Sequence, residues 1–506
     1  MNRPIGWIVL GICVLTGCQP KKYDLIIRNA KLHDGEKSYS EYYDVAVRAD
    51  TIAALAVSGK LNGISENEID AKGLLLSPGF IDTHSHHDWG LADDPGGLAV
   101  VSQGVTTIIV GQDGGSRWPL TKYFQSLADS PVAVNIGSYS GHNTLRDEVL
   151  KDDFKRTATP PEINRMTAML KQDMEAGAFG LSTGLEYDPG IYSSHDEVLQ
   201  LTKVLPPFHG KYISHLRSED RYFWDALQEI ITIGKETKIP VQISHFKLAM
   251  RGLWGKADSS LRLLEEARKN GVEITADIYP YAYWSSTIRV LFPNRNFSDE
   301  KEAAYILREI TTPEGIIFSH YDPNPEYNGK SLAEVAKQEK KPAEKMLIEL
   351  IRRLDECDKK KGDCSGSIVA TSMEENDIGK LMQWQHSNIC SDGASTGRHP
   401  RGFGAFTRVL AYYVREKKIL TLDEAIYKMT ALAADHMGIN KRGRIKAGHY
   451  ADLVLFNPAT VKDEATLAEP QKISSGIERV WVNGREVFSN HQITGLRPGQ
   501  VIHRAQ

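Results

Sequence analysis

The chain has few cysteines and lacks an extended basic stripe, internal repeats and low-complexity segments. It has 5 cysteines among 506 residues and a net charge of −4. Lysine and arginine are scattered except for "KKKG" at residues 359–362, so no basic stripe suggests binding to nucleic acid. The apolar run at residues 5–15 is too short to span a bilayer as a permanent helix. We therefore expect a small-molecule or peptide-like partner.

The N-terminus reads as an export signal. Arg3 supplies a positive charge, residues 5–15 are apolar, and small residues precede Cys18. The segment "LTGC" resembles a bacterial lipobox, in which Cys18 becomes the lipidated first residue of the mature chain. An ordinary secretory signal is the alternative. Both predict export, and the lipobox predicts a bacterial lipoprotein anchored to the membrane by its lipid and facing the periplasm, with residues 1–18 as its signal peptide.

Export leaves three cysteines to consider. Cys13 is removed with the signal and Cys18 is acylated, which leaves Cys357, Cys364 and Cys390. Cys357 and Cys364 are seven residues apart, and an oxidising compartment allows a local disulfide between them. Two unpaired thiols are the alternative.

The two ends of the chain have the same character. Short alternating strands with glycine and polar turns follow the signal, in "DLIIRNAKLHDG" and "YYDVAVRADTIAALA", and similar patterns return after residue 443. We expect residues 23–76 and 443–506 to pair into one small β-sandwich domain around a different middle.

The middle of the chain, residues 77–442, alternates strands with helices, which predicts an α/β fold with a parallel sheet. Eight strand candidates occur, the number that a closed (β/α)₈ TIM barrel requires: "LLLSPGFIDTHSH", "VTTIIVG", "VAVNIGS", "AFGLSTGLEY", "KYISHLRSE", "VQISHFK", "EITADIYPY" and "SNICSDG". Residues 285–380, approximately, contain further strand-like runs and are interpreted as an insertion before the last barrel strand.

Histidines follow three of these strands. His84 and His86 are two residues apart after the first strand, so both imidazoles point to the same side of an extended chain. His215 and His245 end two later strands in matching "ISH" contexts. Strand ends converge at one mouth of a barrel, so these side chains can share a metal ion.

Asp392 ends the last strand candidate, in "SDG". A carboxylate at that mouth can take a proton from an attacking water and return it to a leaving group. In isolation the same tripeptide is a turn former.

These motifs together resemble the D-aminoacylase, or N-acyl-D-amino-acid deacylase, family of the amidohydrolase superfamily. The resemblance runs in order through "LIIRNAKLHDG", "PGFIDTHSH", "GLSTGLEYDPG", "ISHLRSE", "ISHFK", "DIYPY", "SDG", "HPRGFGAFTRVL" and "GRIKAGHYADLVLF". It implies a (β/α)₈ barrel with a small β-sandwich built from both chain ends. It also implies zinc: a tight site at His215, His245 and a cysteine after strand two, and a weaker site at His84 and His86. Asp392 would be the general base and then the proton donor.

Asp113 marks a departure from the family pattern. The usual "GNCG" after the second strand is "GQDG" in this chain, so Asp113 stands where relatives have the metal-binding cysteine. Aspartate oxygen can ligate zinc, and the change from soft sulfur to hard oxygen loosens the preference for zinc over other divalent ions. We predict that Asp113 is a ligand, bridging two ions where two bind; a turn former is the alternative. The fourth strand offers no lysine as a bridge, and Glu186 there is a second carboxylate candidate.

The resemblance also implies how substrate binds. An arginine in "HPR", here Arg401, grips the substrate carboxylate, with Lys247 and Tyr281 as supporting contacts. Arg398 competes with Arg401, because the interval between "SDG" and "HPR" is about two residues shorter than usual.

We therefore expect an exported, metal-dependent amide hydrolase with one or two divalent ions. Zinc is the expected metal, and other divalent ions are the alternative. Its expected substrates are N-acyl-D-amino acids or dipeptides with a C-terminal D-residue. One alternative is a cyclic amide hydrolase of the dihydropyrimidinase kind, although the lysine bridge of that class is missing. The other is a lipid-anchored binding protein without turnover.

Overall fold

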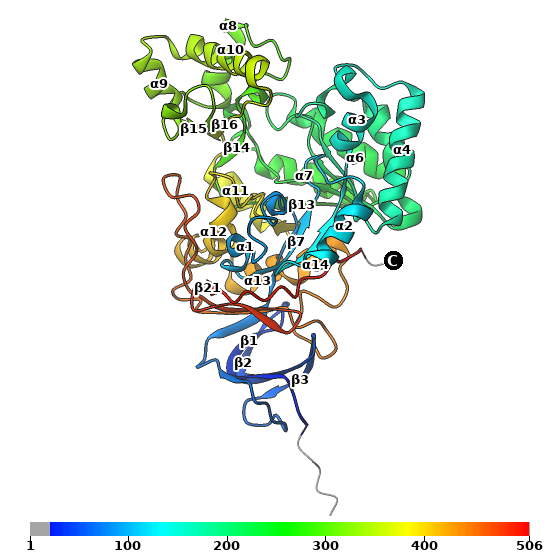
Figure 1. The fold of residues 1–506 in the computed structure, drawn as a ribbon, viewed down its shortest axis with the longest axis vertical. Coiled ribbons are helices and arrows are strands. Elements are labelled where there is room, and N and C mark those ends of the chain that lie inside the picture. Colours follow the sequence, from blue (N-terminus) through cyan, green and yellow to red (C-terminus); the bar gives the residue numbers. More distant parts are fainter. Residues whose placement is uncertain (1–20, 505–506) are drawn as a thin grey trace, which may run out of the picture.

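A computed structural model describes residues 21–504. The predicted signal peptide and Cys18 lie outside these described residues. Within the described part, the chain forms a barrel, a sheet domain and an insertion, with the sheet domain and the insertion at opposite ends of the molecule (Figure 1). No helix in this part is long and apolar enough to cross a membrane.

The barrel has the predicted eight parallel strands in chain order. They are β6 (Phe80–Asp82), β7 (Val105–Val110), β8 (Asn135–Ser138) with its continuation β9 (Ser140–Gly141), β10 (Gly180–Gly184), β11 (Lys211–His215), β12 (Val241–Ile243), β13 (Ile274–Ile278) and β17 (Ser387–Ile389). A parallel bridge between Ser85 and Gly393 joins the first strand to the last and closes the ring. The predicted (β/α)₈ fold is confirmed.

Buried β-branched runs and capped helices account for this architecture. Every residue of β7, with the sequence "VTTIIV", is buried, as expected for a parallel strand covered on both faces. Helix α4 (Pro160–Glu175) begins with a capping box between Thr159 and Glu162 and has proline in its first turn. The other helices of the barrel region are α1 (Leu98–Val101), α2 (Leu120–Asp129), α3 (His142–Leu150), α5 (His195–Thr202), α6 (Phe223–Thr237), α7 (Ala257–Lys269), α11 (Glu375–Gln383), α12 (Arg401–Arg408), α13 (Leu422–Met429) and α14 (Ala431–Met437).

The sheet domain draws on both ends of the chain, as expected. Its nine strands are β1 (Leu25–His33), β2 (Ser38–Arg48), β3 (Thr51–Val57), β4 (Glu68–Asp70), β5 (Leu75–Pro78), β18 (Leu453–Phe456), β19 (Ile477–Val482), β20 (Arg485–Ser489) and β21 (Gln492–Ile493). They are hydrogen-bonded into one sheet, which curls so that Ile52 donates to the main-chain oxygen of His449 at 2.8 Å. One core therefore packs side chains of β1 to β3 against those of β18 and β19.

The predicted sheet-domain segment 443–506 includes residues that leave the sheet. After β21 the chain returns to the barrel, where Val501 bridges Ile136 in parallel and Ile502 is buried among apolar side chains of the barrel. The apolar residues near the C-terminus thus pack with the barrel and not with the sheet domain.

The insertion between β13 and β17 folds around its own core. It contains the antiparallel strands β14 (Tyr283–Thr287), β16 (Gly366–Thr371) and β15 (Ile316–Tyr321), with helices α8 (Glu300–Tyr305), α9 (Leu332–Gln338) and α10 (Ala343–Lys361). A disulfide joins Cys357 to Cys364, which decides between the two alternatives that the sequence left open, and Cys390 is a buried free thiol.

Candidate metal centre

The histidines and aspartates singled out in the sequence lie together at the C-terminal ends of the barrel strands. His84 and His86 follow β6, His215 ends β11, and His245 follows β12. Asp113 follows β7 and Asp392 follows β17. Strands far apart in sequence thus deliver imidazole and carboxylate groups to one mouth.

Three of these residues occupy an uncommon backbone conformation. Asp113, His245 and Asp392 have φ values of 52°, 34° and 49°. These values lie in the left-handed backbone region, which residues other than glycine rarely adopt. Such positions cluster at functional sites, where the surrounding structure holds them. The conformation turns each side chain sharply off its strand end.

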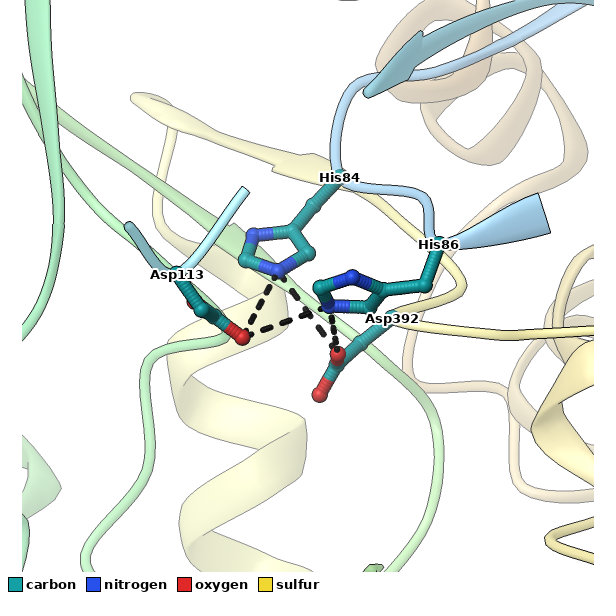
Figure 2. A group of neighbouring side chains, drawn as sticks. All are labelled: His84, His86, Asp113 and Asp392. Carbon is teal, nitrogen blue, oxygen red and sulfur yellow. Dashed lines mark ion pairs between the residues drawn. The ribbon is translucent and has the colours of Figure 1, made fainter. Parts of the chain in front are cut away.

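One group of side chains surrounds the space between the first and last strands (Figure 2). Nε2 of His84 lies 3.4 Å from Oδ2 of Asp113 and 3.6 Å from Oδ1 of Asp392. Nε2 of His86 lies 3.3 Å from each of the same two oxygens. The four ligand-type atoms face one another closely enough to hold one cation.

A second group lies on the other side of Asp113. Its Oδ1 is 3.1 Å from Nε2 of His245, and that nitrogen is 3.0 Å from Nδ1 of His215. The two carboxylate oxygens of Asp113 therefore face different histidine pairs. A carboxylate that bridges two ions needs this arrangement, and the bridging role of Asp113 stays a prediction.

Glu186 and Glu219 form a third group with His215. Oε2 of Glu186 lies 3.1 Å from Nε2 of His215, and Oε1 of Glu219 lies 3.1 Å from Nδ1 of His245. Glu186 was the runner-up carboxylate of the sequence. The sequence interpretation missed Glu219, although it ends the motif "ISHLRSE", four residues after His215.

The donor set fits a divalent metal ion. His84 is fully buried, yet neither of its ring nitrogens has a hydrogen-bond partner. Burial lowers the pKa of His86, but hydrogen bonds to Asp113 and Asp392 outweigh burial and raise that pKa to about 10. Burial and Lys247 lower the pKa of His245, but the nearby carboxylates raise it to about 10. The centre thus has an excess of negative charge that a cation would neutralise, and nitrogen and oxygen donors suit zinc.

Asp392 is held in its ionised form. Burial alone would raise its pKa, but Arg401 and the nearby histidines lower it well below its usual value. Nη1 of Arg401 lies 2.6 Å from Oδ2 of Asp392, and the guanidinium lies 4.9 Å from the ring centre of Tyr279. Asp392 can therefore accept a proton at neutral pH.

The predicted substrate contacts divide into those at the centre and those away from it. Lys247 donates to both oxygens of Glu219, at 2.7 and 2.8 Å, and lines a cavity with Arg401. Arg398 is exposed and lines a separate hollow near residues 467–472, so the structure does not bring it to the metal centre. Tyr281 is buried against His399, with ring centres 5.2 Å apart, and does not line the cavities at the centre. Tyr279 takes the position beside Arg401.

Two cavities open from the centre. The first combines polar groups, such as His215, Lys247 and Arg401, with an apolar end; that end is lined by Ile191, Trp284, Val290, Leu291, Pro293 and Ile310. The second is lined by His86, Asp113 and Trp89, among others. Tyr187, Ser285, Ser286, Asp392 and Arg401 line both.

Comparison with known proteins identifies full-length relatives. A model of the amidohydrolase family matches residues 67–304 and 386–488, and the gap between them falls in the insertion. N-acyl-D-aspartate deacylase of Alcaligenes xylosoxydans xylosoxydans is 34% identical over 96% of this chain and 95% of its own length. D-aminoacylase of the same organism is 32% identical over 95% of this chain and 98% of its own length.

Solved structures of related deacylases also match nearly the whole chain. A D-aminoacylase structure is 31% identical, with a TM-score of 0.84, and the match covers 95% of this chain and 100% of that one. D-aminoacylase is described with a binuclear metal centre. N-acyl-D-glutamate deacylase from Bordetella bronchiseptica, in complex with zinc and a phosphonate inhibitor, is 32% identical, with a TM-score of 0.84 over 95% of this chain and 99% of that one. A D-hydantoinase structure is 14% identical with a TM-score of 0.58 and shares the fold.

Proposed function

The chain belongs to the amidohydrolase family, in its D-aminoacylase group, and we propose that it hydrolyses N-acyl-D-amino acids or dipeptides with a C-terminal D-residue. The observation that carries the proposal is the position of Asp392. Its carboxylate lies between two histidine nitrogens and the guanidinium of Arg401. A metal-binding group, a proton acceptor and a receptor for a carboxylate are thus adjacent. Full-length similarity to three deacylases of N-acyl-D-amino acids supports this substrate class.

The metal ligands would be His84, His86, Asp113, His215 and His245. One or two divalent ions, with zinc as the expected metal, would polarise the scissile carbonyl and lower the pKa of a water molecule. Asp113 would ligate through both oxygens, and Glu219 would accept a hydrogen bond from the outer nitrogen of His245 and so fix its ring.

Asp392 would move the proton. As an ionised carboxylate at the mouth, it takes a proton from the attacking water and delivers it to the departing amine nitrogen. The carbon–nitrogen bond then breaks, giving a carboxylic acid and a free D-amino acid.

Arg401 would receive the free carboxylate of the substrate, with Lys247 beside it. Arg401 has five donors and uses one of them on Asp392 at 2.6 Å, so others remain for a substrate carboxylate. The ring of Tyr279 stacks against the guanidinium and would take the supporting role that the sequence suggested for Tyr281. The apolar end of the first cavity favours an apolar D-side chain.

Cyclic amide hydrolysis is the weaker candidate. Dihydropyrimidinase-type structures share the fold at low identity. Strand β10, with the sequence "GLSTG", has no lysine to carry the bridge expected of that class. A binding protein without turnover would not need Asp392 as a proton acceptor.

A substrate panel tests the reaction. Purified protein loaded with zinc is assayed on N-acetyl-D- and N-acetyl-L-amino acids and on L,D-dipeptides, before and after chelation. We expect turnover of D-forms, with loss on chelation and recovery on adding metal. Turnover of L-forms alone, or full activity in metal-free protein, would contradict the proposal.

A matched arginine pair tests the carboxylate site. We expect Arg401→Gln to raise KM for N-acetyl-D-leucine at least tenfold, because about 1.4 kcal/mol of binding corresponds to a factor of ten. Arg398→Gln is the control and should change KM less than about twofold, since Arg398 lies at a separate hollow. The reverse result would assign the carboxylate to Arg398.

We also propose that the protein is exported and anchored through a lipid on Cys18. The lipobox "LTGC" and the disulfide between Cys357 and Cys364 support this, because structural disulfides persist in oxidising compartments. The described chain starts at the sheet-domain end, so an anchor there would leave the insertion at the end away from the membrane (Figure 1). Expression in a bacterial host should give a membrane-bound, periplasm-facing protein, and Cys18→Ser should release it from the membrane. A soluble wild-type protein would contradict the anchor.

A further inference from the structure

Trp89 is an exposed aromatic side chain beside the metal centre for which the proposed reaction has no use. It is the last residue of the short helical turn η1 (His87–Trp89) and follows the proposed metal ligand His86 by three residues. Its side chain is 49% exposed, although it lines the second cavity together with His86 and Asp113. A ligand that fills this cavity would therefore contact the indole.

Arg117 holds the indole ring of Trp89 in place. The guanidinium carbon of Arg117 lies 3.7 Å from the ring centre, a close cation–π stack. Arg117 forms no salt bridge with another described residue, so this stack is its main contact with a charged or aromatic partner. The guanidinium thereby covers one face of the indole, which also lines the second cavity.

The direction of the substrate follows from the two cavities. Lys247 lines only the first, and Arg401 lines both, so the carboxylate and side chain of a D-residue fit the first cavity. The scissile amide then lies at Asp113 and Asp392. In this orientation the acyl group on the other side of the amide would extend toward His86 and into the second cavity, which Trp89 lines.

We propose that Trp89 and Arg117 form a subsite for the acyl part of the substrate, and that it accepts acyl groups with a flat or apolar body, such as aryl-acyl or blocked peptidyl groups. This inference rests on the proposed deacylase function. The reaction is the same amide hydrolysis; only the released acid changes. An acetyl group has no flat or extended body to lie against the indole, so the subsite adds selectivity and leaves the basal reaction unchanged.

Two acyl derivatives of one amino acid test this subsite. N-acetyl-D-leucine and N-phenylacetyl-D-leucine are assayed with the zinc-loaded full-length enzyme and its Trp89→Ala variant. We expect the variant to lose about tenfold in kcat/KM for the phenylacetyl substrate, the scale of a lost aromatic contact, and less than twofold for the acetyl substrate. Trp89→Phe should restore most of the loss.

Trp224→Ala is the matched control. Trp224 is 37% exposed and does not line the second cavity, so this variant should leave the ratio of the two kcat/KM values unchanged. Equal effects of Trp89→Ala on both substrates would overturn the subsite while leaving the deacylase function intact. Failure of the wild type to hydrolyse either substrate would refute the deacylase function and the subsite with it.

Discussion

Buried polar groups at the two ends of the barrel differ in whether the protein supplies their hydrogen-bond partners. Lys211, at the start of β11, is 1% exposed, and its ammonium donates to Gln242 at 2.8 Å, Thr275 at 3.0 Å and the main-chain oxygen of His436 at 2.9 Å. At the other end, His84 is fully buried and has no hydrogen-bond partner on either ring nitrogen. The first end is satisfied by the protein itself, and the second is not.

This difference separates structural polar groups from functional ones. A buried polar group without a partner costs free energy, so a stable fold normally pairs it. Lys211 has as many acceptors as an ammonium has donors, so nothing further is needed there. His84 and its neighbours hold facing nitrogen and oxygen atoms at the strand ends and would gain their missing partner from a cation. The predictions below test whether the two ends differ in this way.

Replacing Asp392 should have the largest effect. We expect Asp392→Asn to lower kcat by about a thousandfold, because the amide cannot carry the proton and general acid–base catalysis contributes roughly a hundred to ten thousandfold. The zinc content, measured by plasma emission spectrometry, should stay within about twofold of the wild type, because His84, His86 and Asp113 remain. Activity that survives with bound zinc would remove Asp392 from the reaction.

Asp113 tests the metal centre itself. Asp113→Ala should lower bound metal and activity together, with metal affinity reduced at least about a hundredfold, since both histidine pairs face this carboxylate. Asp113→Cys should keep zinc but bind Mn²⁺ less well, because sulfur is a softer ligand than oxygen.

Glu186→Gln is the comparison variant for Asp113. Glu186 touches His215 alone among the predicted ligands, so its loss should cost less metal than the loss of Asp113. If Glu186→Gln empties the centre and Asp113→Ala does not, Asp113 is a turn residue.

Much of the fold could be predicted from the sequence because the barrel strands are short, buried runs. "VTTIIV" can pack on both faces, and a strand of this kind fits a parallel barrel. The strand-end histidines could be found for the same reason, because the end of each apolar run marks the mouth. Residues 494–504 were harder, since their return to the barrel depends on burying Ile502 in a distant cluster.

The finer contacts of the site could not be predicted because they lie beyond the strands. Alternation along a strand would put Tyr279 and Tyr281 on the same side, but β13 ends at Ile278 and the chain then turns, so only Tyr279 reaches Arg401. Arg398 and Arg401 are three residues apart, and only the start of helix α12 at Arg401 decides which one is buried. The only feature of the sequence that pointed to Glu219 was its spacing of four residues after His215.

The satisfied end of the barrel can be disrupted separately. Lys211→Met should lower the free energy of unfolding by about 3 kcal/mol, because it removes an ammonium that donates to three acceptors inside the protein. Chemical denaturation measures this. The zinc content and kcat/KM of the folded variant should match the wild type. Loss of metal in Lys211→Met would mean that the two ends are coupled.

A pH dependence of stability should appear only in metal-free protein and should be absent from the metal-loaded enzyme. The pKa values of His86 and His245 are raised to about 10, above the 6.5 of an ordinary imidazole, so the folded chain keeps protons that the unfolded chain releases. The resulting stabilisation is complete below pH 6.5 and is lost as the pH rises toward 10, by about 1.4 kcal/mol per pH unit for each proton kept. A bound ion takes the place of those protons, so metal-loaded protein should lack this slope. Melting temperatures of chelated and zinc-loaded protein between pH 6.5 and 9.5 measure the difference, and parallel curves would mean that the imidazoles at the mouth do not exchange protons for metal.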